Sequence, residues 1–157
     1  MPAITVTGLV PAEELGMIAP HEHIFCDYSK DYVAPPENIK QLMAEMDVDL
    51  EAPITLKSYG FLMREPQWSI YNQILDSYED ARDEPAILKR AGVKTVIDPT
   101  PIGLGRNPLL LRRVAQELDM NLVTGTGYYR NAFHPPEGEE MTAEEIEERI
   151  VRDLMEG

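Results

Sequence analysis

Two histidines, His21 and His23, stand one residue apart in residues 19–27, which read APHEHIFCD. In an extended chain residues i and i+2 share a face, with Cα atoms about 6.6 Å apart. Two imidazoles on one face can bind one metal ion, with zinc–nitrogen bonds of about 2.0–2.1 Å. Neutral imidazole is available near neutral pH and suits zinc, iron, nickel and cobalt. The pair therefore indicates either part of a metal site or two histidines at a surface strand end, since two ligands alone bind weakly.

Polar side chains also follow two further segments that are expected to be strands. They are Asp98, Thr126, Tyr128 and Tyr129. Because chemistry in parallel α/β folds collects at the carboxyl ends of strands, these side chains and the histidines are expected at one edge. Each also has a structural interpretation. Asp98 can cap the turn in DPTP, and Tyr128 and Tyr129 can either line a pocket or pack under the loop.

Three other residue types that could do chemistry have simpler interpretations. Arg106 follows the glycines of IGLGRNP, which has neither the dinucleotide-binding nor the Walker pattern and predicts a tight strand-to-helix turn. Arg106 could hold an anionic group, although we favour a carboxylate of the fold. His134 in FHPP is interpreted as an ordinary loop histidine. Cys26 lacks a base signature nearby and is not expected to be a catalytic thiol.

The elements that must position these residues alternate along the second half of the chain. Residues 93–98 and 121–127 are expected to be strands. A helix is predicted over 107–119, with Asn107 as its N-cap and Pro108 at its first position. Strands that alternate with helices predict a parallel α/β sheet with right-handed crossovers.

Two further helices are predicted on either side of this region. One covers residues 83–92, with Asp83 as its cap. The other covers residues 142–157 and opens with a capping box of Thr142 and Glu145. The apolar positions of this last helix predict a buried stripe that consists of Ile146, Ile150, Val151 and Leu154.

The first half of the chain is less regular. Residues 4–10 are strand-like with a break at Gly8, which indicates a hairpin-like segment, and residues 17–25 are expected to be extended. Residues 27–80 are interpreted as an irregular, partly helical excursion at one end of the fold. Within it, helices are expected after Pro36 and over 65–81, with a loop over 50–60.

Composition limits the classes of function. The 157 residues carry a net charge of −14, which would repel a phosphate backbone or an anionic membrane, so neither nucleic acid nor a membrane is an expected partner. No apolar stretch reaches the ~20 residues that span a bilayer. The opening residues lack a signal-like pattern, and the single cysteine fits a reducing compartment, so we expect a cytoplasmic protein.

Two stretches of the sequence, together with the spacing between them, resemble the phosphotriesterase family of the amidohydrolase superfamily. They are HEHIFCD and GVKTVIDPTPIGLGRNPLLLRRVAQELDMNLVTGTGYY. That family includes organophosphate hydrolases and phosphotriesterase-like lactonases. The resemblance covers most of the chain and is weakest over residues 27–80.

The resemblance implies a (β/α)8 TIM barrel, of which this chain would form the first three βα units after the hairpin-like segment. It also implies a divalent metal centre, with two zinc ions in a complete barrel. The family's H-x-H motif at the end of the first strand matches His21 and His23. The activity that the resemblance implies is attack by a metal-bridging hydroxide on a phosphotriester, lactone or related ester. Tyr129 matches a substrate-pocket position, where lactonase-like members have a tyrosine.

The remaining ligands that the family uses do not match this sequence. The family bridges its metals with a carboxylated lysine or a glutamate after the fourth strand, and later strands add two histidines and an aspartate. Lys94 stands near the amino end of its strand, and His134 lies in a loop. Residues 1–157 are therefore expected to be the amino-terminal part of one hydrolase, with weak metal affinity alone. The alternatives are a non-catalytic half-barrel that self-associates or pairs its open strand edges with another chain, and an inactive degenerate product.

Overall fold

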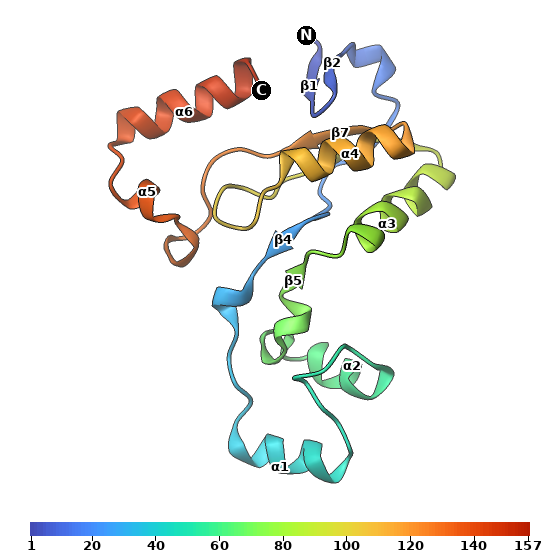
Figure 1. The fold of residues 1–157 in the computed structure, drawn as a ribbon, viewed down its shortest axis with the longest axis vertical. Coiled ribbons are helices and arrows are strands. Elements are labelled where there is room, and N and C mark those ends of the chain that lie inside the picture. Colours follow the sequence, from blue (N-terminus) through green and yellow to red (C-terminus); the bar gives the residue numbers. More distant parts are fainter. The chain divides into compact units, whose positions relative to one another are not determined.

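The computed structural model describes residues 1–157, the side chain of Glu139 excepted. The chain forms two compact units (Figure 1). The first unit combines Met1–Cys26 with Asp76–Gly157, and the second consists of Asp27–Leu75. Among the described residues, no helix is long and apolar enough to cross a membrane.

A three-stranded parallel sheet forms the centre of the first unit. Its strands are β3 (Met17–Ala19), β6 (Val93–Asp98) and β7 (Asn121–Thr124), in the order β3-β6-β7. The register places Ala19 opposite Val96 and Asp98 opposite Thr124. The predicted parallel α/β arrangement is therefore confirmed, and the carboxyl ends of all three strands lie at one edge of the sheet.

Helices α3 (Tyr78–Arg90) and α4 (Pro108–Leu118) pack against this sheet and each other. The predicted start of α4 is confirmed, because the Asn107 side chain accepts a hydrogen bond from the Leu110 N–H at 3.0 Å. The predicted start of α3 at Asp83 is wrong. The helix begins earlier, because the Ser77 hydroxyl accepts a hydrogen bond from the Asp80 N–H and caps it there.

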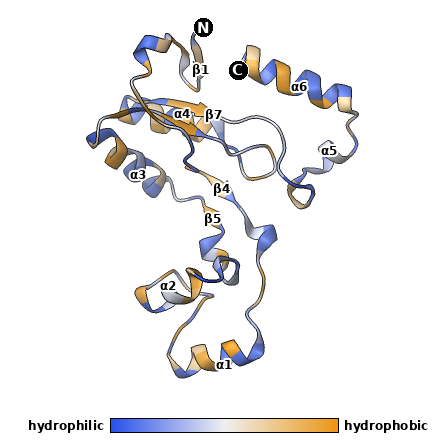
Figure 2. Cartoon of the chain, turned by 180° about the vertical axis from the view of Figure 1, so that it is seen from behind, coloured by the Kyte–Doolittle hydropathy of each residue, from blue (hydrophilic) through white to orange (hydrophobic). Residues whose placement is uncertain are grey.

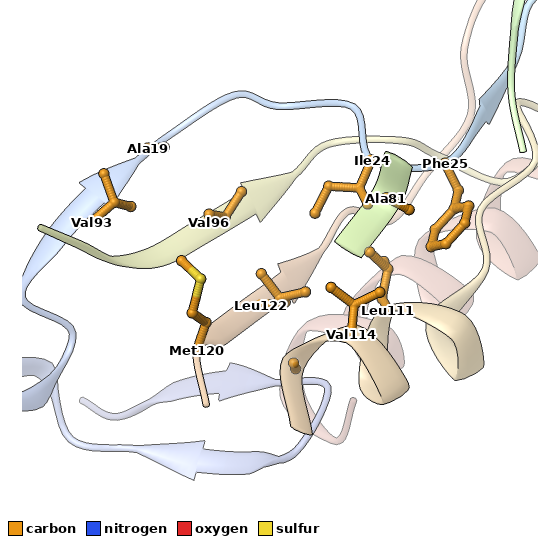
Figure 3. Close-up of a cluster of buried hydrophobic side chains, with 11 residues drawn as sticks. Ala19, Ile24, Phe25, Ala81, Val93, Val96, Leu111, Val114, Met120 and Leu122 are labelled. Atoms are coloured by element: carbon orange, nitrogen blue, oxygen red, sulfur yellow. The ribbon is translucent and has the colours of Figure 1, made fainter. Parts of the chain in front are cut away.

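The core of the first unit fills the space between the sheet and these helices (Figure 3). Val96, Val114 and Leu122 are fully buried, and burial of each such side chain stabilises the fold by about 1.5–3 kcal/mol. The whole cluster consists of Ala19, Ile24, Phe25, Ala81, Val93, Val96, Leu111, Val114, Ala115, Met120 and Leu122. Two of these core residues, Ile24 and Phe25, directly follow His23 in the sequence.

The N-terminal segment forms an antiparallel pair of strands, β1 (Ala3–Thr5) and β2 (Gly8–Val10). Just after β1, the backbone N–H of Val6 donates a hydrogen bond of 2.9 Å to the Leu122 carbonyl of β7. Because β7 pairs with β6 on its other side, this contact lies on the outer edge of the sheet. A short 3-10 helix, η1 (Ala12–Glu14), leads from the pair into β3.

The C-terminal part of the first unit contains η5 (Asn131–Phe133), α5 (Pro136–Glu139) and α6 (Ala143–Met155). The predicted capping box of α6 is confirmed, since Thr142 and Glu145 exchange hydrogen bonds. The predicted buried stripe is wrong, because none of its four residues is buried and Ile146 and Ile150 are only partly covered. Val151 and Leu154 are 50% and 62% exposed. Figure 2 shows that apolar and polar stretches alternate along α6.

The second unit has its own small core of Met43, Val48, Leu50 and Leu62. Its helices are α1 (Glu37–Glu45) and α2 (Leu56–Leu62), with 3-10 helices at η2 (Ser29–Asp31), η3 (Pro66–Trp68) and η4 (Ile70–Asn72). Short strands β4 (Cys26–Asp27) and β5 (Ile74–Leu75) stand at the two ends of this stretch.

Two predictions for this stretch are wrong. The loop expected over 50–60 contains the start of α2, because Thr55 and Ser58 form a capping box there. The helix expected over 65–81 is instead broken into η3, η4 and β5 before α3 begins. Pro66 starts the first of these 3-10 turns, and the Gln73 side chain donates a hydrogen bond to its carbonyl at 2.7 Å, which holds the chain in a compact turn.

Candidate metal site

His21 and His23 lie immediately beyond the carboxyl end of β3, which stops at Ala19. The expectation that a strand aligns their side chains is therefore wrong in detail, because both residues belong to the following loop. Their rings are nevertheless neighbours, with centroids 5.3 Å apart and planes inclined by 78°. The loop, rather than strand pleating, brings the two imidazoles together.

Backbone hydrogen bonds attach this loop to the end of β6. The Glu22 N–H donates to the Ile97 carbonyl at 3.0 Å. The Ile24 N–H donates to Asp98 Oδ2 at 3.3 Å. Since Ile24 and Phe25 are buried in the core, His23 is held from both sides of its position in the chain. Core packing therefore sets the backbone position of the second histidine.

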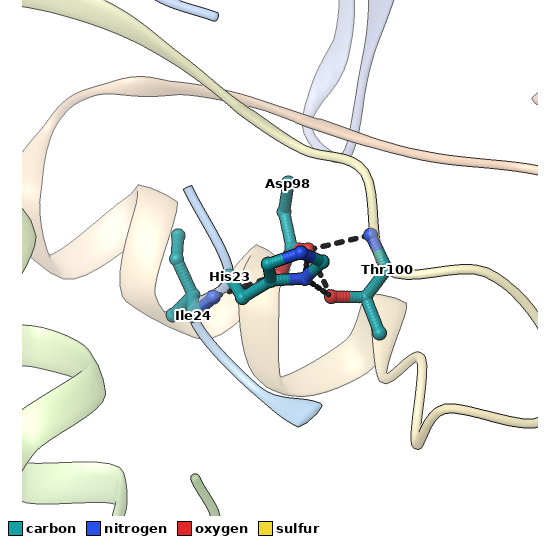
Figure 4. Close-up of polar contacts among 4 residues, drawn as sticks. All are labelled: His23, Ile24, Asp98 and Thr100. Carbon is teal, nitrogen blue, oxygen red and sulfur yellow. Dashed lines mark hydrogen bonds and ion pairs between the residues drawn. The ribbon is translucent and has the colours of Figure 1, made fainter. Parts of the chain in front are cut away.

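A buried polar network connects the His23 ring to Asp98 through Thr100 (Figure 4). His23 Nδ1 lies 2.8 Å from Thr100 Oγ1. The Thr100 hydroxyl and its backbone N–H both donate to Asp98 Oδ1. Asp98 and Thr100 are each only 1% exposed. His23 Nδ1 and Asp98 Oδ1 are 4.0 Å apart, so the hydroxyl bridges a gap too long for a direct hydrogen bond.

The surroundings of His23 favour its neutral form. Partial burial lowers the pKa of its imidazole, the negative charge of Asp98 opposes this effect, and the neighbouring His21 reinforces it. The net result is a pKa below the ordinary value of a histidine. Because a metal ion binds the neutral ring, this environment reduces the competition between protons and a metal ion.

The two imidazoles fit a metal ion as part of a ligand set. With zinc–nitrogen bonds of about 2.0–2.1 Å and tetrahedral angles, two imidazoles on one ion have ring centres about 5 Å apart. The observed separation of 5.3 Å matches that geometry. Within the described part of the chain, no group of three or more His, Cys, Asp or Glu side chains could hold a metal. His21 and His23 can therefore supply two ligands of a larger set.

The tyrosines lie in the loop that follows β7. Ile102 and Tyr128 form a parallel bridge, which joins this loop to the loop after β6. Tyr128 Oη accepts a hydrogen bond from Arg149 at 3.0 Å and contacts Met141 Sδ at 3.4 Å. Tyr129 is 45% exposed, and its ring makes an edge contact with Phe133. Tyr128 thus packs within the fold, whereas Tyr129 presents part of its ring at the surface.

His134 contacts the same loop and not the histidine pair. Its Nε2 atom lies 2.9 Å from the Tyr129 carbonyl, and its ring contacts Tyr128 edge-on. These local contacts fit the interpretation of His134 as a loop residue.

Arg106 pairs with a carboxylate of the fold. Its Nη1 atom donates to Asp153 Oδ2 at 3.0 Å and to the Gly125 carbonyl at 2.9 Å. The Thr126 hydroxyl donates to the same Asp153 oxygen at 2.6 Å. This clasp, formed by Arg106, Thr126 and Asp153, ties α6 to the loops after β6 and β7. In this structure Thr126 therefore supports the fold rather than the histidine pair.

The fold agrees with that of a known protein family. A family model described as the phosphotriesterase family matches residues 2–157. The chain belongs to the phosphotriesterase family. Among its family relatives, a phosphotriesterase-related protein of Nematostella vectensis is 31% identical across 99% of this chain and 43% of its own length. An N-acetyltaurine hydrolase of Xenopus tropicalis is 29% identical across 98% of this chain and 42% of its own.

A solved structure shows the same fold. It is the crystal structure of a resiniferatoxin-binding protein from Rhodobacter sphaeroides, with a TM-score of 0.89 and 31% identity. The match covers 99% of this chain and 42% of that one. This phosphotriesterase-family chain therefore spans less than half the length of the relatives it matches, and its fold is consistent with part of the family's TIM barrel.

Thr100 is the residue at this site that the sequence reasoning missed. It stands two positions after the strand-ending Asp98, in DPTP. A hydroxyl at that spacing can bond back to the aspartate in a tight turn, which is a recognisable local signal. The contact to His23 spans 77 positions, however, and no local pattern predicts it.

The clasp leads to a prediction about stability. Arg106 and Asp153 are only 20% and 21% exposed, so a double-mutant cycle with Arg106→Met and Asp153→Asn should give a coupling of about 1–3 kcal/mol. Urea unfolding measures it. The exposed pair Arg113 and Glu117 provides the control, because surface pairs contribute ~0.5 kcal/mol or less. A coupling no larger than that of the control pair would contradict the prediction.

The coupling should also depend on pH. Burial alone would raise the pKa of Asp153, but hydrogen bonds from Thr126 and Arg106 and the charge of Arg106 outweigh it and lower the pKa. The stabilisation is therefore complete above the unfolded pKa of about 3.9 and disappears as the pH falls through the folded value. The cycle repeated in acid should give a smaller coupling than at neutral pH.

Proposed function

We propose that this chain supplies the first two metal ligands of a metal-dependent hydrolase. The observation that carries the proposal is the pair of neighbouring imidazoles, His21 and His23, at the carboxyl edge of a parallel sheet. In this proposal the chain contributes the first three βα units of a (β/α)8 barrel. His21 and His23 hold one ion of a two-zinc centre, and residues outside this chain complete the ligand set.

A bound divalent metal would lower the pKa of a water molecule and polarise the oxygen of the bond to be cleaved. The chain's own residues would bind the metal ion, orient the ligand rings and contact the substrate. His21 and His23 provide ring nitrogens, and Asp98 with Thr100 holds His23 in place. Tyr129 offers an exposed aromatic ring, which suits the apolar part of a small substrate. The family membership supports a phosphotriester, a lactone or a related ester as the substrate.

A second substrate class has support of its own. Several relatives that match 98% of this chain are N-acetyltaurine hydrolases, so the bond cleaved can be an amide rather than an ester. Amide and ester hydrolysis both proceed through water attack on a carbonyl carbon, so the water activation that a bound metal would supply suits both. The part of the active site outside this chain would then decide between them.

Metal binding and hydrolysis by the purified protein test the proposal. Isothermal titration with Zn²⁺ measures stoichiometry and affinity, and assays with an aryl phosphotriester, an aliphatic lactone and N-acetyltaurine identify the substrate class. We expect metal binding that depends on His21 and His23, and hydrolysis of one class that a chelator abolishes. Metal binding that is unchanged when both histidines are replaced would overturn the proposal.

The proposed alternative without catalysis is self-association or pairing with another chain through exposed strand edges. The strand β7 is the last strand of its sheet and supports this alternative. Size-exclusion chromatography with light scattering tests it. A defined dimer without metal-dependent activity would favour this function over the hydrolase.

A further inference from the structure

We propose that Thr100 is a positioning residue that, held by Asp98, fixes His23 in the tautomer with its proton on Nδ1. The role of this tautomer in metal binding rests on the proposed function. The tautomer places the acceptor lone pair of the neutral ring on Nε2. A metal ion binds such a lone pair, and a hydrogen bond at the other nitrogen commonly sets which nitrogen is available.

The hydrogen-bond directions around Asp98 carry the first step. Asp98 Oδ1 faces both donors of Thr100, and Asp98 Oδ2 faces the Ile24 N–H. Each carboxyl oxygen of Asp98 therefore faces a backbone N–H, which can only donate, so both oxygens act as hydrogen-bond acceptors. The Thr100 hydroxyl must therefore donate its single proton to Asp98.

The second step follows from the chemistry of a hydroxyl group. With its proton committed to Asp98, Thr100 Oγ1 can only accept from His23 Nδ1, 2.8 Å away. The neutral His23 ring must then carry its proton on Nδ1. The opposite direction would require the hydroxyl to turn away from Asp98 and leave a buried carboxyl oxygen with one donor fewer, which is unfavourable.

The geometry also explains why a threonine stands between the imidazole ring and the carboxyl group. His23 Nδ1 and Asp98 Oδ1 are 4.0 Å apart, so the aspartate cannot accept directly from the ring. Thr100 extends the reach of Asp98 by one hydroxyl. The backbone N–H of Thr100 also binds Asp98, at 2.9 Å, so the hydroxyl is anchored at the correct end of β6.

Nitrogen-15 NMR of the metal-free protein, labelled at its three histidines, tests the tautomer directly. The spectra are recorded near pH 8, more than one unit above the ordinary histidine pKa of about 6.5. A His23→Gln variant identifies the resonances of His23. We expect a protonated Nδ1 and an unprotonated Nε2 in the wild-type protein. A wild-type ring protonated on Nε2 would overturn the inference without any variant being needed.

Three variants separate positioning from general stability. Thr100→Val removes the hydroxyl and should give a mixture of tautomers, whereas Thr100→Ser should restore the wild-type signature. Thr124→Val is the matched control, because the Thr124 hydroxyl, at the end of the neighbouring strand, is buried with no hydrogen-bond partner among the described residues. An unchanged His23 tautomer in folded Thr100→Val protein would also overturn the inference.

Zinc titration gives a second readout that distinguishes the inference from the proposed function. Thr100→Val should weaken Zn²⁺ binding by about 10–100-fold, Thr100→Ser should recover it, and Thr124→Val should leave it unchanged. If the wild-type protein has the expected tautomer but binds no zinc, the proposed function fails while the assignment of His23 stands. If it binds zinc with the opposite tautomer, only the inference fails.

Discussion

His23→Ala is expected to weaken Zn²⁺ or Co²⁺ binding by at least ~100-fold. Loss of a residue that only hydrogen-bonds to a metal ligand typically costs about 10–100-fold. The physical reason is the loss of one of the two neighbouring imidazoles, whose rings are 5.3 Å apart. The remaining His21 is exposed and would be the one imidazole left in this loop. Competition against a chromophoric chelator measures the affinity in both proteins.

His134→Ala is the matched control for this experiment. His134 is the one remaining histidine of the chain, and its ring contacts the loop after β7 rather than the histidine pair. Its replacement should leave metal affinity unchanged. Far-ultraviolet circular dichroism shows whether each variant is folded. Equal losses of affinity in both variants would mean that the metal binds elsewhere or without a specific site, and would contradict the assignment.

Gly103→Ala is expected to destabilise the protein by about 3 kcal/mol or more. Gly103 has a φ of +95°, a conformation that costs a residue with a side chain about 1–2 kcal/mol. A Cβ atom at this position would also lie 1.9 Å from the carbonyl oxygen of the buried Phe133. To relieve that overlap the backbone must move, which adds about 1–3 kcal/mol.

Gly92→Ala separates the two causes. Gly92 has nearly the same φ, +97°, but a Cβ atom there would have no neighbour within 4 Å. Gly92→Ala should therefore show the conformational cost alone, and the difference between the variants is the cost of the overlap. Thermal unfolding can detect it, because each kcal/mol shifts the midpoint by about 2–4 °C at this size. Equal midpoints would show that the loop adapts without strain.

The expected movement in Gly103→Ala also reaches the candidate site. Gly103 lies in the loop after β6, next to the Ile102–Tyr128 bridge that joins this loop to the one after β7. A shift of Phe133 would move Tyr129, whose ring packs against it. In a complete enzyme we therefore expect Gly103→Ala to impair substrate binding as well as stability, whereas Gly92→Ala should affect stability alone.

Local signals predicted a substantial part of this fold. The Asn107–Pro108 start of α4 and the Thr142–Glu145 capping box depend on residues within four positions, so the sequence shows them directly. The same local reasoning misplaced the start of α3. Asp83 followed by Pro85 looks like a helix start, yet Ser77 caps the helix six residues earlier and Pro85 lies inside it.

The two histidines of the candidate site were predictable from the sequence, but the contacts that bring the site residues together were not. The spacing of His21 and His23 suggested a shared face of a strand, whereas the loop after β3 actually brings the rings together. Burial of Asp98 and its link to His23 through Thr100 depend on the pairing of β3 with β6, which lies beyond any local pattern. Long-range contacts of this kind decide which polar side chains meet.

The hydrogen bond from Val6 to the outer edge of β7 has a consequence for assembly. Leu122 and Thr124 stand two residues apart in β7, so the backbone groups of both point the same way, away from β6. The Leu122 carbonyl is already bound to Val6, while Thr124 lies two residues further on. Any segment that joins this edge must therefore start its pairing near Thr124 or displace the N-terminal segment. The first residues of the chain thus cover part of the β7 edge and restrict where a further strand can pair with it.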